Sequence, residues 1–342
     1  MLGRLTKITL LVISATLATL AILLVGCGKT QPPYMTIEGQ SLGTFLQISI
    51  PATHPQGEIE EMIIEVDSLA KASMSIFHPE SLLSKINRNE TATADEHIVR
   101  NIELAKQFSE LSDGAYDITI KPLTDAWGFG RNKTTTNIND VNVDSLLNFV
   151  GQDKLSLEGR EILKQDPRVQ IDLNSIAKGY TVDLVAERLE AFGFDSYMVC
   201  IGGEIRCKGH NSRGSRWSIG IETPYDGNMS GDSFEKIVHL EDCAVATSGN
   251  YRRFYLTDDG RKVAHTIDPR TGYSIISDLL SATVVAPTCA EADAAATMFM
   301  SIGDTAKVVA LAEQCAEERG WRYYFIFADG DDYRVECSEE FR

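Results

Sequence analysis

One stretch organises the expected fold around it: Ile171-Asp172-Leu173-Asn174-Ser175-Ile176-Ala177-Lys178-Gly179-Tyr180-Thr181-Val182-Asp183. The apolar run at residues 169–173 is typical of a strand, and the apolar residues from 176 to 192 recur with helical spacing before Gly193 ends the pattern. Together they predict a strand that turns directly into a helix. Such a corner directs free backbone N–H groups and the positive end of a helix dipole at one point, which suits a bound phosphate. An ordinary capped helix with Lys178 on its solvated face is the alternative, and the stretch alone favours it.

The composition excludes several classes of partner. The chain has 342 residues, of which 43% are hydrophobic and 24% are charged, and these values are typical of a soluble globular protein. Its net charge of −17 argues against a general nucleic-acid binder or a binder of anionic membrane surfaces. A phosphorylated ligand would therefore need a local device, such as a metal ion or a helix terminus.

The N-terminus predicts a lipoprotein signal peptide, which is set apart from the fold. A short basic region precedes an apolar run at residues 8–25, and Leu24-Val25-Gly26-Cys27 resembles a bacterial lipobox ending in the cysteine that is acylated, for example with palmitate. We expect residues 1–26 to be removed, Cys27 to be lipidated and residues 27–36 to form a tether. The protein would then face the periplasm, anchored to the inner or the outer membrane. A single-pass transmembrane anchor is the alternative.

The chain contains seven cysteines, and the six beyond Cys27 show no metal-binding pattern. They are Cys200, Cys207, Cys243, Cys289, Cys315 and Cys337. None forms a C-x-x-C pair or has the spacing of zinc ligands. Several lie within apolar runs, so we expect buried free thiols. An oxidising compartment would also allow pairs, which spacing cannot assign.

Residues 37–342 are expected to form one domain, because no internal repeat and no clear linker divides them. Strand-like and helical patterns are interspersed, which predicts an α+β or mixed α/β fold with mixed sheets and packed helices. The expected helices lie at 59–70, 98–108, 176–192, 289–301 and 304–319. The expected strands lie at 46–50, 116–120, 169–173, 197–201, 205–208, 217–221, 254–256, 262–264, 281–286, 323–328 and 333–337, and residues 131–144 and 224–233 are expected loops.

Two further patches have compositions that suit a functional site. The glycine pair in Cys200-Ile201-Gly202-Gly203-Glu204 follows an apolar strand and would let a ligand or another backbone approach closely, although a plain tight turn explains it as well. His265 follows the patch Thr247-Ser248-Gly249 and lies near Asp268 and Arg270 at a Pro/Gly turn. It is a candidate acid–base group, with a structural histidine at a strand end as the alternative.

The most informative patch is Ala290-Glu291-Ala292-Asp293-Ala294-Ala295-Ala296-Thr297. On a helix, Asp293 and Thr297 are four residues apart and face the same way. The alanines around them leave room for another group to approach. A carboxylate and a hydroxyl supply two hard oxygens, which suit magnesium better than zinc. The alternative is a small-residue helix packed tightly against a sheet, with Thr297 bonded back to its own helix.

Taken together, these patches resemble the FAD:protein FMN transferases, also called ApbE-like flavin transferases. The matching residues run in family order: Leu42-Gly43-Thr44; Ser75-Ile76-Phe77 with 81–87; 114–119 with Pro122; 172–183; Gly202-Gly203-Glu204; Thr247-Ser248-Gly249; 265–272; and 290–297. The patterns Asp-Leu-x-x-Ile-Ala-Lys-Gly-Tyr, His-x-Ile-Asp-Pro-x-Thr-Gly and Ala-Asp-Ala-x-x-Thr are the specific ones. The resemblance covers nearly everything after the tether and implies a single ApbE-like, T-fold-like domain.

What the resemblance implies is a magnesium-dependent enzyme that transfers FMN from FAD to a threonine or serine hydroxyl of an acceptor flavoprotein and releases AMP. Magnesium would be held by the side chains of Asp293 and Thr297 and by the backbone carbonyl of Ser175. FAD contacts are implied for Leu42, Phe77, Ala115, Tyr116, Asp117, Asp172, Lys178 and Ile267. His265 is similar to the family's proposed catalytic histidine, and Asp268 and Asp183 are other candidate bases. The acceptors implied are flavin-carrying subunits of membrane electron-transfer complexes.

Three residues depart from the family pattern. Leu42 stands where methionine is usual, Phe77 replaces a common tyrosine, and Cys200 occupies a frequent asparagine position. None of these changes removes a metal ligand or His265, so the expected activity stands. Other functions stay open: a magnesium-dependent FAD pyrophosphatase that yields free FMN and AMP, a non-catalytic lipoprotein that binds FAD, and a generic solute-binding lipoprotein. The last would not explain the pairing of Asp293 with Thr297.

Overall fold

The computed structural model describes residues 32–130, 142–224, 234–250, 254–256, 262–330 and 332–341. Residues Tyr34–Arg342 form one compact unit. Its first strand begins at Tyr34, within the stretch expected to be a tether and before the expected domain start at residue 37. The expected signal peptide and Cys27 lie outside the described residues. Among the helices that are described, none is long and apolar enough to cross a membrane.

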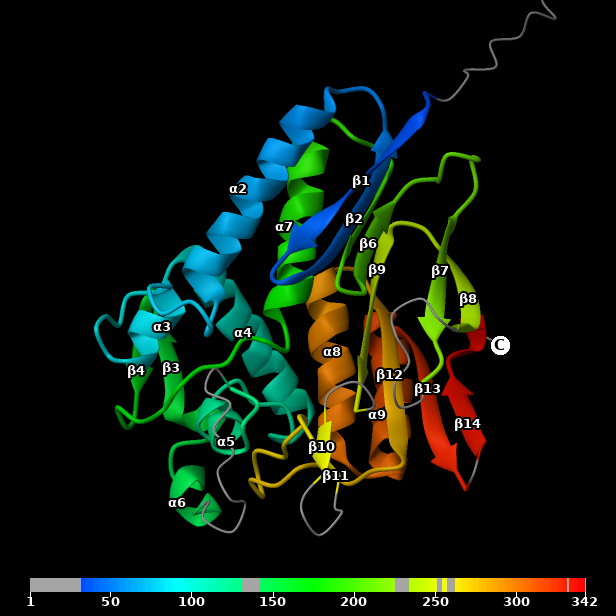
Figure 1. Cartoon of the computed structure of the whole chain (residues 1–342). Coiled ribbons are helices and arrows are strands. Elements are labelled where there is room, and N and C mark those ends of the chain that lie inside the picture. Colours follow the sequence, from blue (N-terminus) through cyan, green and yellow to red (C-terminus); the bar gives the residue numbers. More distant parts are fainter. Residues whose placement is uncertain are drawn as a thin grey trace, which may run out of the picture. The chain divides into compact units, whose positions relative to one another are not determined.

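An eight-stranded antiparallel sheet forms the framework of this unit, in the order β1-β2-β5-β6-β9-β12-β13-β14 (Figure 1). Its strands are β1 (Tyr34–Ser41), β2 (Thr44–Pro51), β5 (Tyr197–Ile201), β6 (Glu204–Lys208), β9 (Cys243–Gly249), β12 (Leu279–Ala286), β13 (Arg322–Asp329) and β14 (Asp332–Cys337). Three small sheets pair β3 (Leu155–Glu158) with β4 (Glu161–Lys164), β7 (Trp217–Glu222) with β8 (Phe234–Leu240), and β10 (Phe254–Leu256) with β11 (Lys262–Ala264). The described strand pairs are antiparallel, so the structure is α+β, the first of the two expected classes.

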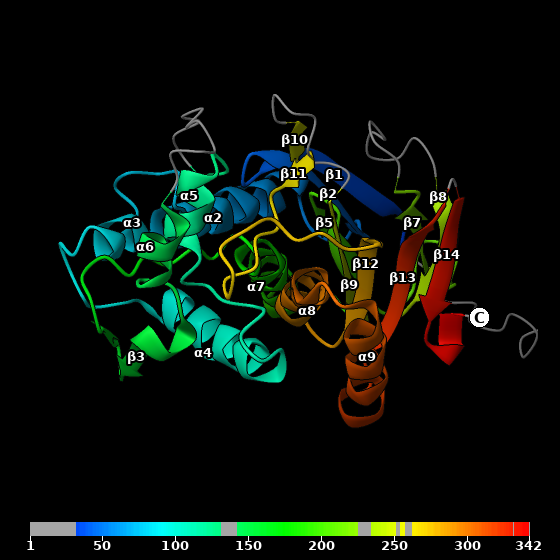
Figure 2. The ribbon, with the colours of Figure 1, turned by 90° about the horizontal axis from the view of Figure 1, so that it is seen from below.

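Helices cover one face of the large sheet, and a hairpin covers part of the other face. The helices are α2 (Gln56–Met74), α3 (Leu82–Asn87), α4 (Glu96–Leu111), α5 (Lys121–Ala126), α6 (Val143–Leu147), α7 (Ala177–Ala191), α8 (Cys289–Ile302) and α9 (Thr305–Arg319). α7 and α8 lie side by side, α7 against β5 and β6 and α8 against β9 and β12 (Figures 1 and 2). β7 and β8 pack on the opposite face through an apolar cluster that includes Trp217, Val238 and Tyr324.

Sequence signals at the helix ends explain where α8 and α9 begin and stop. Thr288 and Glu291 form a capping box at the start of α8, each side chain accepting a hydrogen bond from the other residue's backbone N–H. Asp304 caps α9 by accepting from two backbone N–H groups of its first turn, and Gly320 ends the helix in the left-handed conformation. α7 differs, because its N-cap residue Ile176 has no side-chain cap and the first turn meets α8 instead.

Most of the expected elements are confirmed. All five expected helices are present, and nine of the eleven expected strands correspond to named strands. The six cysteines beyond Cys27 are free thiols and five of them are buried, as expected. The strands β1, β3, β4, β8 and β9 were not expected from the sequence. Residues 131–141 and 225–233, which make up most of the two expected loops, lie outside the described residues.

The strands expected at residues 116–120 and 169–173 are wrong. The two segments run side by side but share a single bridge, the parallel pair Ile120 and Gln170. Most of their apolar side chains are buried, and those of Ile118 and Ile171 are fully buried. The side chain of Asn87 takes the place of a neighbouring strand, because it accepts from the backbone N–H of Ile171 at 2.7 Å and donates to its carbonyl oxygen at 2.8 Å. Burial without a hydrogen-bonded ladder therefore accounts for these apolar runs.

α7 and α8 are in close contact at Gly179. A Cβ atom at this position would lie 2.2 Å from the carbonyl oxygen of Cys289 and 2.8 Å from the Cβ atom of Asp293. The backbone N–H of Gly179 donates to Oδ2 of Asp293 at 2.9 Å. The missing side chain at residue 179 thus lets α8 place the Asp293 carboxylate against the first turn of α7.

Replacing Gly179 with alanine is expected to lower the free energy of unfolding by about 1–3 kcal/mol, because the added methyl group overlaps backbone atoms that cannot move alone. Urea denaturation measures this change. Gly57→Ala is the matched control, since Gly57 lies in α2 with no atom within 4 Å of an added Cβ. The control should be as stable as the wild type or slightly more so. Equal unfolding free energies for Gly179→Ala and the wild type would contradict the close contact.

Candidate active site

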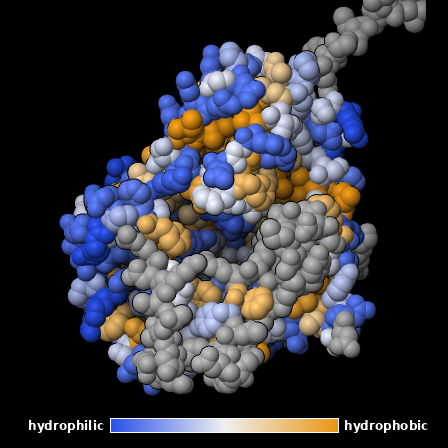
Figure 3. Space-filling view, viewed as in Figure 1, coloured by the Kyte–Doolittle hydropathy of each residue, from blue (hydrophilic) through white to orange (hydrophobic). Residues whose placement is uncertain are grey.

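A cavity of about 320 Å³ lies where α7, α8, β9 and the segment after β11 meet, which is within the size range of ligand pockets. Figure 3 shows hydrophilic side chains around a hollow near the middle of the face seen in Figure 1. Ten of the residues predicted from the sequence line this cavity: Ala115, Tyr116, Asp117, Asp172, Ser175, Lys178, His265, Ile267, Asp293 and Thr297. Segments far apart in the chain are therefore brought to one place.

Two predicted FAD contacts, Leu42 and Phe77, do not line the cavity. Leu42 lies in the turn between β1 and β2 with a φ angle of 52°, and its backbone N–H donates to Oδ1 of Asp67 at 2.8 Å. Phe77 follows the end of α2 and its side chain is largely exposed. Both assignments came from the resemblance alone, and they stay predictions.

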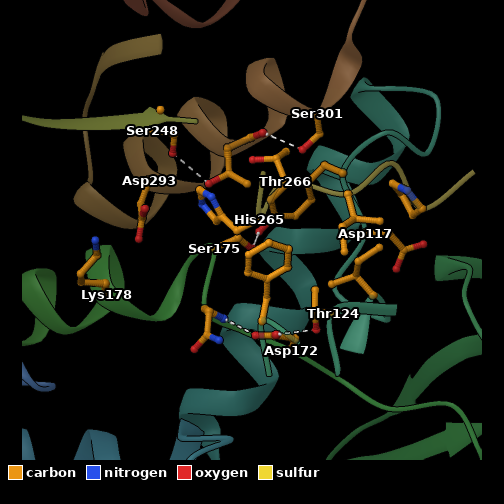
Figure 4. Close-up of a pocket in the computed structure, with 18 of the residues that line it drawn as sticks. Asp117, Thr124, Asp172, Ser175, Lys178, Ser248, His265, Thr266, Asp293 and Ser301 are labelled. Atoms are coloured by element: carbon orange, nitrogen blue, oxygen red, sulfur yellow. Dashed lines mark hydrogen bonds between the residues drawn. The ribbon is translucent and has the colours of Figure 1, made fainter. Parts of the chain in front are cut away.

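Asp293, Lys178 and Glu204 form a charged group at one end of the cavity, in which the two carboxylates are buried and the lysine is half-buried. Nζ of Lys178 lies 2.7 Å from Oε1 of Glu204, and Figure 4 shows the side chains of Lys178 and Asp293 pointing toward one another. Burial, followed by the negative charge of Glu204, raises the pKa of Asp293 to about 7. Burial opposes the charge on Lys178, but Glu204 and Asp293 outweigh it and raise the pKa of the lysine. The lysine therefore stays charged. A further cation beside Asp293 would stabilise the ionised carboxylate of Asp293.

Hydroxyl groups reach the same cavity from α8 and β9. Oγ1 of Thr297 and Oγ of Ser248 are hydrogen-bonded at 3.1 Å. The Thr247 hydroxyl lies 2.8 Å from that of Thr283, across the β9–β12 ladder. The Thr297 side chain is thus directed toward β9. Ser301 lies one turn further along the same face of α8, and its hydroxyl donates to the Thr297 carbonyl oxygen of its own helix.

A second set of polar residues comes from the corner before α7 and from the segment that precedes α5. The hydroxyl of Tyr116 and Oγ of Ser175 are hydrogen-bonded at 2.8 Å. Asp172 accepts from the backbone N–H of Asn174 at 2.9 Å, and burial raises the pKa of its carboxyl. Burial also raises the pKa of Asp117, which accepts from both the N–H and the hydroxyl of Thr119. These buried and half-buried side chains offer hydrogen-bonding groups to the polar atoms of a ligand.

His265 is positioned by the hairpin of β10 and β11, whose last residue is Ala264. The hydroxyl of Ser274 accepts from the backbone N–H of Ala264 and donates to its carbonyl oxygen, which fixes the chain directly before the histidine. The imidazole ring packs edge-on near Phe129, with ring centroids 6.3 Å apart. Figure 4 shows the His265 ring among the side chains of the pocket. It is thus placed to exchange a proton with a ligand in the cavity.

The other candidate bases, Asp268 and Asp183, are engaged elsewhere and do not line the cavity. Asp268 forms an ion pair with Arg270, with Oδ1 and Nε 2.8 Å apart. Asp183 accepts from the first backbone N–H groups of α8, at 2.8 and 2.9 Å, and pairs with Arg206 at 2.8 Å. Asp183 therefore ties α7 to α8, and the geometry favours His265 as the base.

The residues predicted to bind a metal fit a magnesium ion by their chemistry. Asp293, Thr297 and Ser175 all line the cavity, and Asp293 and Thr297 lie one turn apart on α8. In the described part of the chain, no group of three or more His, Cys, Asp or Glu side chains could hold a metal ion. A metal in this cavity would therefore depend on one carboxylate together with hydroxyl and carbonyl oxygens, and magnesium accepts such hard oxygen ligands while keeping several waters.

Four further residues line the cavity whose roles the sequence did not indicate: Thr124, Asn174, Glu204 and Ser248. Glu204 and Ser248 stood in patches that the sequence singled out, but nothing in the chain order pairs them with Lys178 and Thr297. Thr124 and Asn174 flank Asp172 in space through hydrogen bonds to its carboxylate. Only the fold brings these partners together.

A half-buried lysine, a carboxylate suited to a divalent cation and a histidine around one cavity are together typical of enzymes that act on a phosphorylated ligand. A family model described as "ApbE family" matches residues 42–321. The chain belongs to the ApbE family.

Relatives and solved structures agree with this assignment. The chain is 33% identical over 343 residues to a FAD:protein FMN transferase of Haemophilus influenzae, covering 94% of each protein. It is 34% identical over 290 residues to one of Vibrio cholerae, covering 83% of this chain and 85% of that protein. The structure of the flavin transferase ApbE from Vibrio cholerae superposes with a TM-score of 0.79 at 30% identity, covering 90% of this chain and 98% of the other. The ApbE protein of Thermotoga maritima gives a TM-score of 0.78 at 27% identity, with the same coverage.

Proposed function

We infer that this protein transfers FMN from FAD to a hydroxyl group of an acceptor protein and releases AMP. The relatives support this reaction, because those described above are FAD:protein FMN transferases that match the chain over most of its length. The observation that carries the inference is that Asp293, Lys178 and His265 line a single cavity. They supply a metal-binding carboxylate, a cation and a proton acceptor, which a pyrophosphate cleavage requires.

The cavity residues suit attack on the pyrophosphate of FAD. The acceptor hydroxyl oxygen forms a bond to the phosphorus of the FMN part, and the bond from that phosphorus to the AMP oxygen breaks, so that AMP leaves with the electron pair. His265 takes the proton of the hydroxyl, which is otherwise a weak nucleophile. Lys178, held by Glu204, offsets the negative charge that develops on the departing AMP. Asp172, Asp117 and the Tyr116 hydroxyl orient FAD through hydrogen bonds.

We propose magnesium as the resident metal, held by the side chains of Asp293 and Thr297 and by the Ser175 carbonyl. When bound, it would neutralise charge on the pyrophosphate oxygens and make the phosphorus open to attack. Asp293 is the only one of the three groups with a negative charge to offer. The first turn of α7 orients that carboxylate through the Gly179 N–H, so the metal-binding residue is preorganised by the fold.

The reaction is tested by incubating the full chain with FAD, magnesium and an acceptor flavoprotein fragment that carries a target threonine. Intact mass spectrometry should show the acceptor gaining one FMN, with AMP released in equal amount. Free FMN and AMP with an unmodified acceptor would overturn the transfer in favour of an FAD pyrophosphatase. Bound FAD with neither product would instead support the non-catalytic FAD-binding protein.

We further propose that the protein is a lipoprotein anchored through Cys27 and facing the periplasm, where its acceptors are flavin-carrying subunits of membrane electron-transfer complexes. The lipobox-like Leu24-Val25-Gly26-Cys27 supports this proposal. The mature protein, isolated from membranes, should have a diacylglyceryl-modified Cys27 as its first residue. A mature protein that begins at Met1 without lipid would contradict the anchor.

A further inference from the structure

The large sheet has a short seam between β6 and β9. This ladder contains three residue pairs, Ile205 with Val245, Arg206 with Ala244, and Cys207 with Cys243, whereas the other ladders of the same sheet contain between four and eight. The seam joins β1-β2-β5-β6 to β9-β12-β13-β14. Glu204 of β6 and Ser248 of β9, which lie on the two sides of this seam, both line the cavity. The cavity therefore depends on the shortest connection within the sheet.

Two cysteines face each other at the far end of this seam. Cys207 and Cys243 are direct partners in the β6–β9 register, and both are buried, with 2% and 8% of their surfaces exposed. The Cys207 sulfur donates to the carbonyl oxygen of Cys243 at 3.5 Å. Directly opposed residues of antiparallel strands have Cβ atoms about 4.5–5.5 Å apart, close to the roughly 3.5–4.5 Å that a disulfide spans. A small inward shift of the strands would bring the two sulfurs into bonding distance.

The surroundings of Cys243 favour the thiolate that starts disulfide exchange. A guanidinium nitrogen of Arg322 donates to its sulfur at 3.3 Å. The neighbouring Cys207 thiol lowers the pKa of Cys243, as does the charge of Arg322, although burial opposes ionisation. A lowered thiol pKa increases the fraction of thiolate, which is the attacking group in thiol–disulfide exchange.

No other two cysteines share this arrangement in the part of the chain that the structure describes. Cys200 is opposed by Ile205 and Gln47, and Cys337 by Tyr324. Cys289 and Cys315 lie on α8 and α9, outside the sheet. Neither Cys207 nor Cys243 lines the cavity, so a bond between them would leave the cavity residues in place.

We propose that Cys207 and Cys243 form a redox-active dithiol that closes into a cross-strand disulfide and staples the β6–β9 seam. The oxidant is a small disulfide. The Cys243 thiolate attacks one of its sulfurs and releases one small thiolate, and the Cys207 sulfur then attacks Cys243 in the mixed disulfide and releases the second. The protein loses two hydrogens and two electrons, and the small disulfide is reduced to two thiols.

In the test, one sample of the full chain is equilibrated with oxidised glutathione and a second sample with reduced glutathione alone. Both contain urea at a concentration below the unfolding transition, so that glutathione can reach the buried Cys207 and Cys243. Free thiols are then alkylated after complete denaturation, and peptides are mapped by mass spectrometry. The oxidised sample should contain one cross-link between the peptides of Cys207 and Cys243, with Cys200, Cys289, Cys315 and Cys337 alkylated. Once the urea is removed, the melting temperature of the oxidised sample should exceed that of the reduced sample by roughly 5 °C, because the disulfide closes a long loop.

Cys243→Ala is the test variant and Cys315→Ala the matched control, since Cys315 is a buried cysteine on α9. The control should form the cross-link and gain thermal stability on oxidation as the wild type does, whereas the test variant should do neither. The proposal is overturned if Cys207 and Cys243 both stay alkylatable in oxidised wild type, or if either ends as a stable glutathione adduct or pairs with another cysteine. None of these readouts involves flavin transfer, so they stand apart from the proposed enzymatic activity.

Discussion

Asp293→Ala should reduce magnesium-dependent turnover of FAD by about 10³-fold or more, because the variant loses the only negatively charged oxygen among the proposed metal ligands. The carboxylate is buried in the cavity and held by the Gly179 N–H, so no exposed neighbour can replace it by a simple change of side-chain rotamer. AMP release measured over a range of magnesium concentrations checks the prediction. A wild-type rate at limiting magnesium would show that the metal assignment is wrong.

Asp293→Asn is the control that separates metal binding from folding. Asparagine has nearly the same shape and keeps an oxygen that can accept from Gly179, but it carries no charge. This variant should unfold at close to the wild-type urea concentration and still lose most of its magnesium-dependent turnover. If it instead retained turnover while Asp293→Ala did not, the role of Asp293 would be to support the contact between α7 and α8.

His265→Ala should lower the rate of acceptor modification by about 10²- to 10⁴-fold, the range expected for losing a general base. FAD binding, measured by quenching of flavin fluorescence, should change little, because the imidazole is proposed to act on the acceptor hydroxyl. Added imidazole should restore part of the rate, since the variant leaves a space at the cavity where a small base can enter. This rescue distinguishes a lost proton acceptor from a general disturbance of the site.

His78→Ala is the matched histidine control, because His78 is exposed and lies outside the cavity. It should keep the wild-type rate and should not respond to imidazole. A rate for His265→Ala within twofold of the wild type would exclude His265 as the base. Asp268 and Asp183 would then have to be tested, although their ion pairs with Arg270 and Arg206 argue against both.

The helices could be predicted because their signals are local. The apolar residues from Ile176 to Phe192 have helical spacing, and Thr288 with Glu291 marks the start of α8 within four residues of sequence. The relation between Asp293 and Thr297 is local too, since two residues four apart on a helix share a face in any fold. The structure confirms that both residues line the cavity.

The strands were harder to predict, because a strand is defined by its neighbours. β9 has the sequence Cys-Ala-Val-Ala-Thr-Ser-Gly, whose small residues have little preference for strands, yet it lies between β6 and β12. Residues 116–120 and 169–173 have alternating apolar side chains, most of which are buried, but Asn87 satisfies the backbone of Ile171 where a neighbouring strand would otherwise do so. Whether a partner strand is present cannot be read from the apolar pattern itself.

The site could be predicted in its parts but not in its pairings. The residue types at 178, 265 and 293 indicated a phosphate, a proton transfer and a metal, and all three line one cavity. The ion pair of Lys178 with Glu204 and the hydrogen bond of Thr297 with Ser248 join elements that only the fold brings together. The corner before α7 suited a phosphate or an ordinary capped helix by its sequence, and neither interpretation indicated that the Gly179 N–H donates to Asp293.

The measurement that tests the shared site most directly is a crystal structure of the protein with FAD and Mn²⁺, a substitute for Mg²⁺ whose anomalous scattering locates it. We expect one manganese ion bound to the side-chain oxygens of Asp293 and Thr297 and to the Ser175 carbonyl, with the FAD pyrophosphate beside it and within reach of Lys178. Manganese without contact to Asp293, or FAD bound outside the cavity between α7, α8 and β9, would contradict this expectation.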